Sequence, residues 1–409
     1  MAPGDDPKRR NSVYRRRLHP RPFIFYGAAF PASFGLRNWW LPPQVVAAKE
    51  APEPAMPRQF EKDPSRGVPD EGGVDRSLQS RLERAAQRDF DEAVHLLRYA
   101  GLLRAANWKA AARAMRRIGE ADLSLGRLYE GHVNARHLIE TYADPELRSE
   151  CLAQMEEGWL FGVWGADGAK PVSATGDRLS GAKRFASGLG HVDRAIVSAR
   201  SPEGQRLFVV DARDAARHDP GVWRMSGMQQ SRSGGFDCEG LPGRPLGEPD
   251  VYTREPHFLG GTWRIAAVTL GGIVGLLERA SDALRDRGQE EAEAHLLRLA
   301  PIAGRVVSAW PAIMRAGEIA CGDEGIAAPE AAATRSLSVR LLSEEIGQDA
   351  IAAVERSVGL SMFDEADRVG RMARDLACYM RQAARDAFSV KVGRALLMGS
   401  KPLGDWLDG

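Results

Sequence analysis

Histidine and cysteine, the side chains that most often bind metals or act as nucleophiles, are scattered along this sequence. The four cysteines form no C-x-x-C pair and lie far apart, at Cys151, Cys238, Cys321 and Cys378. His132 and His137 stand five residues apart, a spacing that does not place both side chains on one face of a helix. We therefore expect no metal site, and the separated cysteines indicate reduced thiols in a cytoplasmic protein.

A glycine-containing stretch, Gly188-Leu-Gly-His-Val-Asp, has part of the spacing of a loop that binds dinucleotide phosphates. It lacks the third glycine, and a strand-like run follows it where that motif requires a helix. The stretch therefore predicts no dinucleotide fold. The 56 Lys and Arg residues balance 55 Asp and Glu residues, so we also expect no nucleic-acid and no membrane partner.

The length and composition predict a globular protein with two or three packed regions, since 44% of the 409 residues are apolar and 27% are charged. The longest apolar run, residues 265–277, is shorter than the roughly 20 residues that a bilayer span requires and predicts a buried helix. Residues 1–75 contain many arginines and prolines. We expect them to form a disordered or loosely docked extension.

Apolar spacing predicts helices at both ends of the remaining chain and strands between them. Residues 76–154 repeat apolar side chains every three or four positions, which is typical of a helical domain. Residues 155–250 contain short strand-like runs between turns and predict an antiparallel β domain. Residues 251–395 return to the helical period and predict a bundle, followed by a tail at 396–409. The expected fold class is therefore α+β, with four long bundle helices near 263–285, 291–316, 334–358 and 366–385.

Several stretches resemble the acyl-CoA dehydrogenase family. Leu179-Ser-Gly-Ala-Lys-Arg-Phe-Ala-Ser is similar to the family's L-x-G-x-K-x-W-I-T/S, and Gly227-Met-Gln-Gln-Ser-Arg-Ser to its G-M-R-x-S-x-T/S. Glu120-Ala-Asp-Leu-Ser-Leu-Gly resembles part of its first helical domain, and Arg371-Met-Ala-Arg-Asp-Leu its E-R-x-x-R-D-A helix. The family's fold is a helical domain, a β domain and a C-terminal four-helix bundle, the order that the periodicity predicts independently.

The resemblance implies that FAD lies between the β domain and the bundle. Phe185 takes the place of the Trp that stacks on the flavin ring, and Ser187 that of the Thr whose hydroxyl faces flavin N5. Trp164 and Gly165 occupy a loop that touches the flavin in the family, although the usual Thr-Glu-Pro is missing. Gly359 lies in the remnant of the Q-x-x-G-G segment by which a neighbouring subunit touches FAD, so a homodimer or homotetramer is expected. The simpler interpretation of Phe185 and Trp164 is that both are core side chains of strands.

Acyl-CoA dehydrogenation also needs a carboxylate base opposite the flavin, and this base is missing from its two usual places. Gln382 or Ala383 stands where many family members have the Glu, and Gly260-Gly-Thr-Trp-Arg-Ile stands where others have it. The family's R-x-x-F-G stretch, which binds the FAD pyrophosphate, is also absent. The replacement bases nearest to the matched stretches are Asp167, Asp364, Glu365 and Asp367.

Three interpretations remain open. The first, which the resemblance favours, is an FAD-dependent oxidoreductase that acts on a CH–CH group of an acyl thioester, expected to be acyl-CoA, and transfers hydride to flavin N5. The second is a flavin-dependent monooxygenase on the same fold, which uses reduced flavin and O2 and needs no such base. The third is a catalytically inactive structural or regulatory relative. The sequence identifies neither the substrate nor the electron acceptor.

Overall fold

The structure is a computed structural model that describes residues 74–104, 107–381 and 384–407. All of these residues belong to one compact unit of the chain. The expected N-terminal extension, apart from its last two residues, therefore lies outside the described residues. Gln382 and Ala383, at one of the family's two places for the base, also lie outside them.

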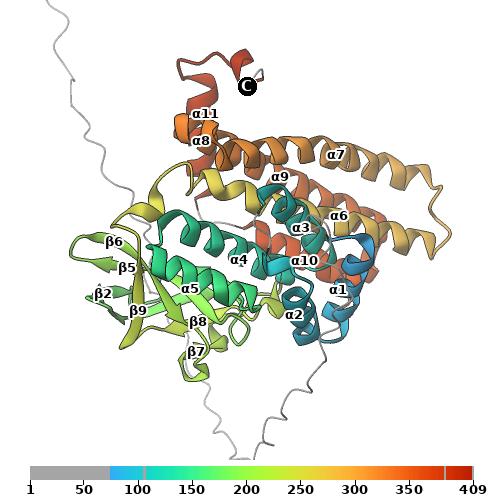
Figure 1. The fold of residues 1–409 in the computed structure, drawn as a ribbon. Coiled ribbons are helices and arrows are strands. Elements are labelled where there is room, and N and C mark those ends of the chain that lie inside the picture. The colour runs from blue at the N-terminus through green and yellow to red at the C-terminus, as the bar shows by residue number, and fades with distance from the viewer. Residues whose placement is uncertain (1–73, 105–106, 382–383, 408–409) are drawn as a thin grey trace, which may run out of the picture. The chain divides into compact units, whose positions relative to one another are not determined.

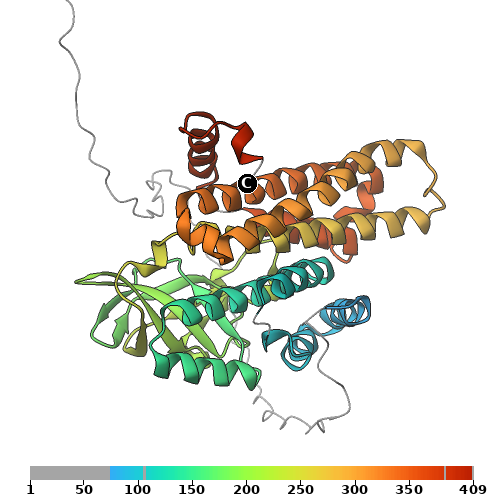
Figure 2. The ribbon, with the colours of Figure 1, turned by 45° about the horizontal axis from the view of Figure 1, so that its top comes forward.

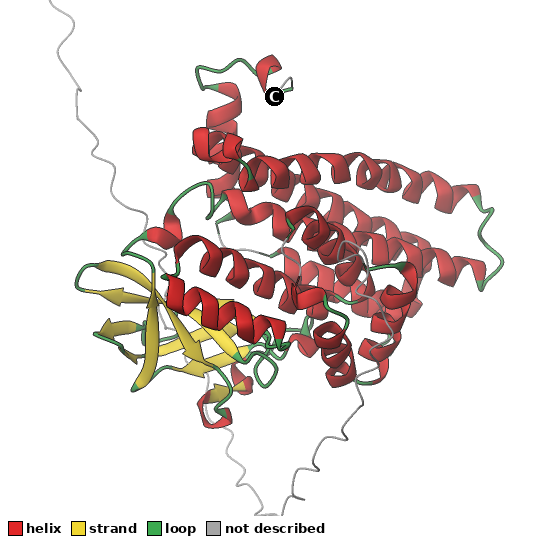
Figure 3. Ribbon diagram, in the orientation of Figure 1, coloured by secondary structure: helices red, strands yellow, loops and turns green. Residues whose placement is uncertain are grey.

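Helices, strands and again helices follow one another along the described chain (Figures 1 and 3). The helices before the strands are α1 (Arg76–Arg88), α2 (Phe90–Tyr99), α3 (Trp108–Ala121), α4 (Leu123–Tyr142) and α5 (Pro145–Glu156). Those after the strands are α6 (Trp263–Arg285), α7 (Glu293–Cys321), α8 (Asp323–Ala327), α9 (Pro329–Val358), α10 (Arg368–Met380) and α11 (Arg385–Leu397). The predicted order of helical, β and helical regions is confirmed, and the domain boundaries stay a prediction.

Short polar side chains fix where the first five helices begin. In each helix an oxygen of an Asp or Asn accepts a hydrogen bond from a backbone N–H of the first turn, at 2.7 to 2.9 Å. Such a cap pairs one of the backbone donors that a helix start leaves unsatisfied. The capping residues are Asp75, Asp89, Asn107, Asp122 and Asp144.

The middle of the chain forms two sheets. The larger sheet contains β1 (Phe161–Trp164), β2 (Ser173–Thr175), β3 (Arg178–Ser180), β5 (Arg194–Ser201), β6 (Gly204–Asp211) and β9 (Leu241–Leu246). Its pairings run β5–β2–β3–β9–β6 and return to β5, so five strands close into a ring, and β1 pairs with β5 outside it. The smaller sheet has the order β4 (Ala182–Ala186), β8 (Gly234–Asp237) and β7 (His218–Asp219).

The prediction of an antiparallel β region is correct for most strand pairs but wrong for two. β1 and β2 both run parallel to β5. A parallel pair needs a long connection, and residues 165–193 between β1 and β5 supply one. Figure 2 shows α4 and α5, in green, beside the sheet, where apolar residues of both helices pack on β1, β5 and β6.

Helix α6 is the central helix of the C-terminal region, since it packs against α3, α7, α9 and α10. Most of the apolar run at 265–277 is buried in it, as predicted. Two segments, Gly260–Arg285 and Glu293–Cys321, have the length and composition of a membrane span. Core helices pass the same test, and 83% of the apolar window of the first segment is buried, against 22% for the second.

Two glycines allow α6 to approach α3 closely. A Cβ at Gly271 would lie 2.1 Å from the carbonyl oxygen of Arg116, and one at Gly275 would lie 2.4 Å from that of Glu120. Both obstacles are backbone atoms of a neighbouring helix, which cannot rotate away as a side chain can. The G-x-x-x-G spacing in α6 is therefore a helix contact inside the protein.

Replacing Gly271 with Ala should destabilise the protein by about 2 kcal/mol or more, because α3 and α6 must move apart to admit a methyl group. The measurement is urea unfolding of wild type and variant. Gly304 is the matched control, since it lies exposed in the interior of α7 and a Cβ there would meet no atom within 4 Å. Gly304→Ala should stabilise by about 0.5–1 kcal/mol through helix propensity. Equal effects of the two substitutions would contradict the close contact.

Candidate functional site

Phe185 lies in a β-bulge of β4. The pairing of β4 with β8 shifts between Lys183 and Ala186, and the backbone of Phe185 has a φ of +57°. A non-glycine residue seldom adopts this left-handed conformation, and such residues concentrate at functional sites. Phe185 meets Trp223 edge to face, with 5.9 Å between the ring centroids. Bulges re-aim side chains, so the simple alternation of a strand no longer describes Phe185.

Ser187, which the resemblance assigns to flavin N5, follows β4 and is half-buried. Its carbonyl oxygen accepts a hydrogen bond from Trp164 Nε1 at 3.1 Å, and its hydroxyl accepts one from Ser233 at 3.0 Å. Trp164 is 2% exposed and packs on Phe236, with 4.9 Å between ring centroids. Trp164 is therefore a core residue that holds the Ser187 backbone, and its direct contact with a flavin stays a prediction.

A line of three serine hydroxyls leads from the loop before β8 to Ser187. Ser231 is fully buried and donates to the carbonyl oxygen of Met228 at 2.6 Å. Its hydroxyl lies 2.8 Å from that of Ser233, which is 4% exposed and donates to Ser187. The Ser187 hydroxyl is therefore held by a line of buried groups.

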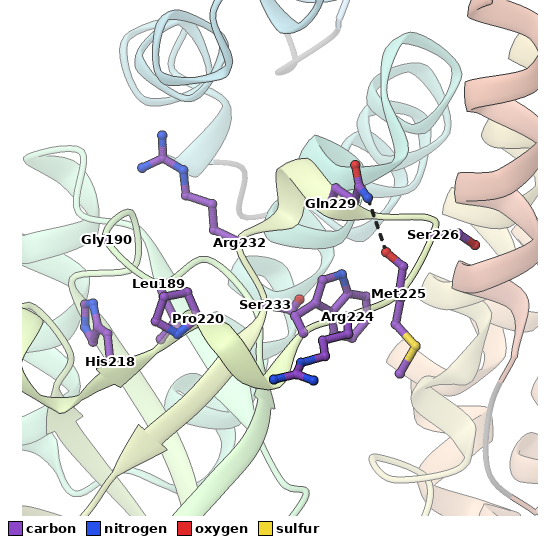
Figure 4. Close-up of a pocket in the computed structure, with 11 residues that line it drawn as sticks. Leu189, Gly190, His218, Pro220, Arg224, Met225, Ser226, Gln229, Arg232 and Ser233 are labelled. Carbon is purple, nitrogen blue, oxygen red and sulfur yellow. Dashed lines mark hydrogen bonds between the residues drawn. The ribbon is translucent and has the colours of Figure 1, made fainter. Parts of the chain in front are cut away.

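A cavity of about 760 Å3 opens beside this line of hydroxyls (Figure 4). Its volume lies within the roughly 300–1,000 Å3 of small-molecule and cofactor sites. The loop at 218–233 supplies most of its lining, and Figure 4 shows Ser226, in the middle of this loop, on the side of the C-terminal helices. No carboxylate is among the described residues that line it. The lining side chains that carry a polar group are His218, Trp223, Arg224, Ser226, Gln229, Arg232 and Ser233.

Trp223 lines the cavity and carries a hydrogen-bond donor for which the described residues supply no acceptor. Its Nε1 is buried and has no hydrogen-bond partner in the part of the chain that the structure describes. Because a buried indole N–H normally has an acceptor, a ligand oxygen or nitrogen in the cavity would complete the hydrogen bonding of Trp223. The face of Phe185 is covered by the exposed guanidinium of Arg184, 4.0 Å from the ring centroid. A ring that stacks on this face therefore requires Arg184 to swing outward.

Two contacts fix the cavity loop to α10. A Cβ at Gly227 would lie 2.3 Å from the carbonyl oxygen of Arg374, so the approach of the loop requires glycine. Met228, with a φ of +57°, donates its backbone N–H to Asp375 at 2.5 Å. The Arg-Asp pair of the last matched helix therefore joins the β region to the C-terminal helices.

The carboxyl group of Asp375 is 8% exposed, and burial raises its pKa to about 6. The value of about 6 also includes the smaller raising effect of the Asp122 carboxyl on this pKa and the lowering effects of the Met228 N–H and the guanidinium groups of Arg371 and Arg374. Burial also raises the pKa of Asp122, which caps α4. Asp375 does not line the cavity, so its protonation state can affect a bound ligand only by changing the position of the loop that it holds.

The four carboxylates considered as bases lie away from the cavity lining. Asp167 forms an ion pair of 2.7 Å with Lys183, whose side chain is fully buried, and accepts a hydrogen bond from the Val172 N–H. The other three lie in the turn between α9 and α10, where Asp367 caps α10 by accepting from the Gly370 N–H. A catalytic role for any of them stays a prediction. The three carboxylates of the turn are Asp364, Glu365 and Asp367.

The structure brings four of the five predicted cofactor residues together at the ends of β1 and β4, although none of the four is among the residues that line the cavity. Trp164, Phe185 and Ser187 are described above, and the exposed Gly165 accepts hydrogen bonds through its carbonyl from Lys183 and Ser198, at 3.3 and 3.2 Å. Gly359 instead ends α9 with a φ of +80°, and a Cβ there would meet no atom within 4 Å. Its backbone conformation explains this glycine as a helix stop, and its contact with a cofactor stays a prediction.

Sequence reasoning did not assign roles to Trp223, Ser233 and Asp375. Ser233 and Asp375 lie in stretches that resemble the family, so a comparison of every position in those stretches would have singled them out. Trp223 lies outside them, and no spacing rule marks it. Its importance follows from the fold, which places it across from Phe185 and leaves its N–H unpaired.

Solved structures with the same arrangement identify the fold. FMN-bound TdsC of Paenibacillus sp. A11-2, a dibenzothiophene monooxygenase, superposes with a TM-score of 0.69 and 18% identity, over 81% of this chain and 98% of that protein. A glutaryl-coenzyme A dehydrogenase in complex with glutaryl-CoA superposes with a TM-score of 0.66 and 16% identity, over 80% and 97%. The chain therefore has the acyl-CoA dehydrogenase-like fold, which confirms the resemblance at the level of the fold.

Sequence comparison finds dibenzothiophene monooxygenases. The enzyme of Mycolicibacterium goodii is 29% identical over 215 residues, which cover 45% of this chain and 51% of that protein. The enzyme of Rhodococcus erythropolis is 28% identical over 170 residues, which cover 36% and 40%. The matches thus span 51% and 40% of the length of these curated relatives. No family model matches the sequence.

Asp375→Asn should flatten the pH dependence of stability. The folded protein holds the Asp375 proton more tightly than the unfolded chain, whose carboxyl has a pKa near 3.8, so the stabilisation is complete below about pH 4 and is lost as pH rises through about 6. Asn keeps an oxygen that accepts from Met228 and cannot ionise. Urea unfolding at pH 4, 5, 6 and 7 measures the free energy of unfolding of both proteins. As the pH rises, this free energy should increase in the variant relative to wild type by up to about 3 kcal/mol.

Asp386→Asn is the control for this series, because Asp386 is exposed in the first turn of α11. It should keep the wild-type dependence on pH. Parallel curves for wild type and Asp375→Asn would contradict a proton held by Asp375 in the folded state.

Proposed function

We propose that this chain, on its acyl-CoA dehydrogenase-like fold, binds a flavin in the cavity beside Ser187 and acts as a flavin-dependent monooxygenase. Bound reduced flavin would supply two electrons to O2, so that one oxygen atom enters the substrate and the other leaves as water. The observation that carries the proposal is a cavity whose described lining residues include an indole donor without a partner and the hydroxyl of Ser233, but no carboxylate.

The described residues fit a flavin in three respects. The cavity has a suitable volume, and Trp223 and Phe185 offer aromatic surface to an isoalloxazine ring. The N–H of Trp223, which lines the cavity, can donate to the polar edge of that ring, and the hydroxyl of Ser187 lies 3.0 Å from that of the lining residue Ser233. Arg224 and Arg232 line the same cavity and can bind a phosphate. Arg232 already pairs with Asp91 at 2.6 Å, so Arg224 is the better candidate.

The roles of the site residues follow from these contacts. Ser187 would hold the flavin edge at N5, Trp223 would orient the ring through its N–H, and Arg224 would neutralise the phosphate. The Gly227 and Met228 contacts with α10 would keep the loop in one position, so that the donors need no rearrangement when a ligand enters.

The missing base favours a monooxygenase over a dehydrogenase. Removing an α-proton from a thioester requires a positioned carboxylate, and Asp167, the one nearest the predicted flavin residues, is held by a buried lysine. Insertion of an oxygen atom requires no positioned carboxylate. The partial matches to dibenzothiophene monooxygenases support the same choice and point to an aromatic sulfur compound as the first substrate to test.

An FAD-dependent dehydrogenase of an acyl thioester is the second candidate, favoured by the likeness in fold to glutaryl-coenzyme A dehydrogenase. FAD, acyl-CoA, a homo-oligomer and a cytoplasmic location all stay predictions. TdsC contains FMN, and FMN and FAD share the ring that the proposed contacts recognise, so both cofactors belong in the tests.

The two functions differ in the direction of electron transfer. In the monooxygenase, reduced flavin gives electrons to O2, and in the dehydrogenase, oxidised flavin takes electrons from acyl-CoA. We expect protein with reduced FMN, mixed with 18O2 and dibenzothiophene, to yield a product that carries one labelled oxygen atom. A dehydrogenase would instead show bleaching of oxidised FAD by acyl-CoA in the absence of O2, which would overturn the proposal in favour of the second candidate. Failure of the protein to bind any flavin would support the inactive relative.

Arg224→Gln should weaken FMN binding by roughly 5- to 10-fold, because a charge-assisted hydrogen bond to the phosphate is lost at a partly exposed site. Riboflavin has the same ring without the phosphate, so its affinity should not change. Fluorescence titration measures both. Arg394→Gln, on an exposed position of α11, is the control and should leave both affinities at wild-type values. Equal losses for FMN and riboflavin would contradict a phosphate contact by Arg224.

A further inference from the structure

Met225 lies in the wall of the cavity, and its side chain is not packed into the core. It is one of the lining residues, it is 41% exposed, and it belongs to neither hydrophobic cluster of the described residues. Its carbonyl oxygen accepts a hydrogen bond from Gln229 at 3.4 Å, the dashed line of Figure 4, so this contact holds the backbone and not the thioether. The side chain is unbranched and has three rotatable bonds, so its sulfur can take several positions at the cavity wall.

Exposure distinguishes Met225 from most methionines in the part of the chain that the structure describes. Of these methionines only Met398, directly after α11, is also exposed, at 81%. Met228, three positions after Met225 in the same loop, is 3% exposed and is not a lining residue. An oxidant in bulk solution should therefore attack Met398 first, whereas one produced in the cavity should attack Met225 first.

The proposed reaction would bring an oxidant for sulfur to this place. Oxidants convert the thioether of methionine to a sulfoxide. A dialkyl thioether is also a better nucleophile than the sulfur of dibenzothiophene, whose lone pair is delocalised into the aromatic rings. Resting on the proposed flavin site, we propose that Met225 is a modification site that accepts an oxygen atom and becomes methionine sulfoxide when reduced flavin and O2 react while no substrate occupies the cavity.

The atoms and electrons of this step balance. O2 takes two electrons from reduced flavin and two from the Met225 sulfur, its O–O bond breaks, and an S–O bond forms. The second oxygen atom leaves as water with the two protons that accompany the flavin electrons. Reduced flavin and O2 are the co-reactants of the proposed monooxygenase, so the step needs no other oxidant. Its product replaces an apolar group in the cavity wall with a polar one.

The experiment incubates the protein with reduced FMN and 18O2, without substrate and with catalase present to remove peroxide from solution. Trypsin cuts after Arg224 and Arg232, and tandem mass spectrometry of the peptide 225–232 locates the label. We expect one labelled oxygen atom on Met225, introduced at least about 10-fold faster than on Met398 because the reacting groups are held together, and none on Met228. Dibenzothiophene should slow the labelling of Met225, since it competes for the same oxygen atom.

Two substitutions and one reagent serve as controls. Met225→Leu keeps a similar volume without the sulfur and should end the labelling of this peptide. Met398→Leu is the matched control and should leave Met225 labelled at the wild-type rate. Added H2O2, without flavin or reductant, should reverse the order and oxidise Met398 about twice as fast as Met225, in keeping with exposures of 81% and 41%.

A second measurement does not depend on turnover. Saturating oxidised FMN should protect Met225, but not Met398, from added H2O2. Absence of this protection, with FMN bound, would place the flavin away from Met225 and overturn the inference. Labelling of Met225 that is no faster than that of Met398 would overturn it too, and oxygenation of dibenzothiophene by the same protein would leave the proposed function standing. If the protein binds no FMN, the proposed function and the inference fail together.

Discussion

The structure depends on the junction between the cavity loop and α10. At this junction the Gly227 backbone touches the Arg374 carbonyl, and the Met228 N–H is bound by a carboxyl group that is itself almost fully buried. One side of the junction continues into Ser231 and Ser233 and reaches Ser187, and the other side belongs to a helix that packs on α6 and α9. The orientation of the hydroxyls therefore depends on the packing of the C-terminal helices.

This junction also explains why residues distant in sequence matter to the site. Asp122, at the start of α4, raises the pKa of Asp375 on α10, and Asp375 holds the loop that carries the serines. The buried acids are close to one another, so ionising one disfavours ionising the other. The charge state at this point is set jointly by an N-terminal helix and a C-terminal helix, although neither lines the cavity.

The sequence predicted the order of the regions well because each signal is local. The apolar spacing that predicts α6, α7 and α9 needs only the chain itself, and the segments predicted near 263–285, 291–316 and 334–358 agree closely with the observed helices. Ser187 and Phe185 could be named because they stand in a recognisable stretch. The parallel pairing of β1 and β2 with β5, the bulge at Phe185 and the partners of Trp223 could not, because each depends on contacts between distant segments.

The division of the strands between two sheets has a consequence for how this protein can diversify. Each strand of the closed ring has neighbours on both sides, so an insertion or deletion there disturbs two ladders at once. β4 lies at the margin of the small sheet, where it pairs with β8 on one side and has only a short backbone contact with residues 166–168 on the other, so the bulge at Phe185 interrupts one ladder instead of two. A change in the conformation of residues 184–190 therefore leaves the pairings of the ring in place.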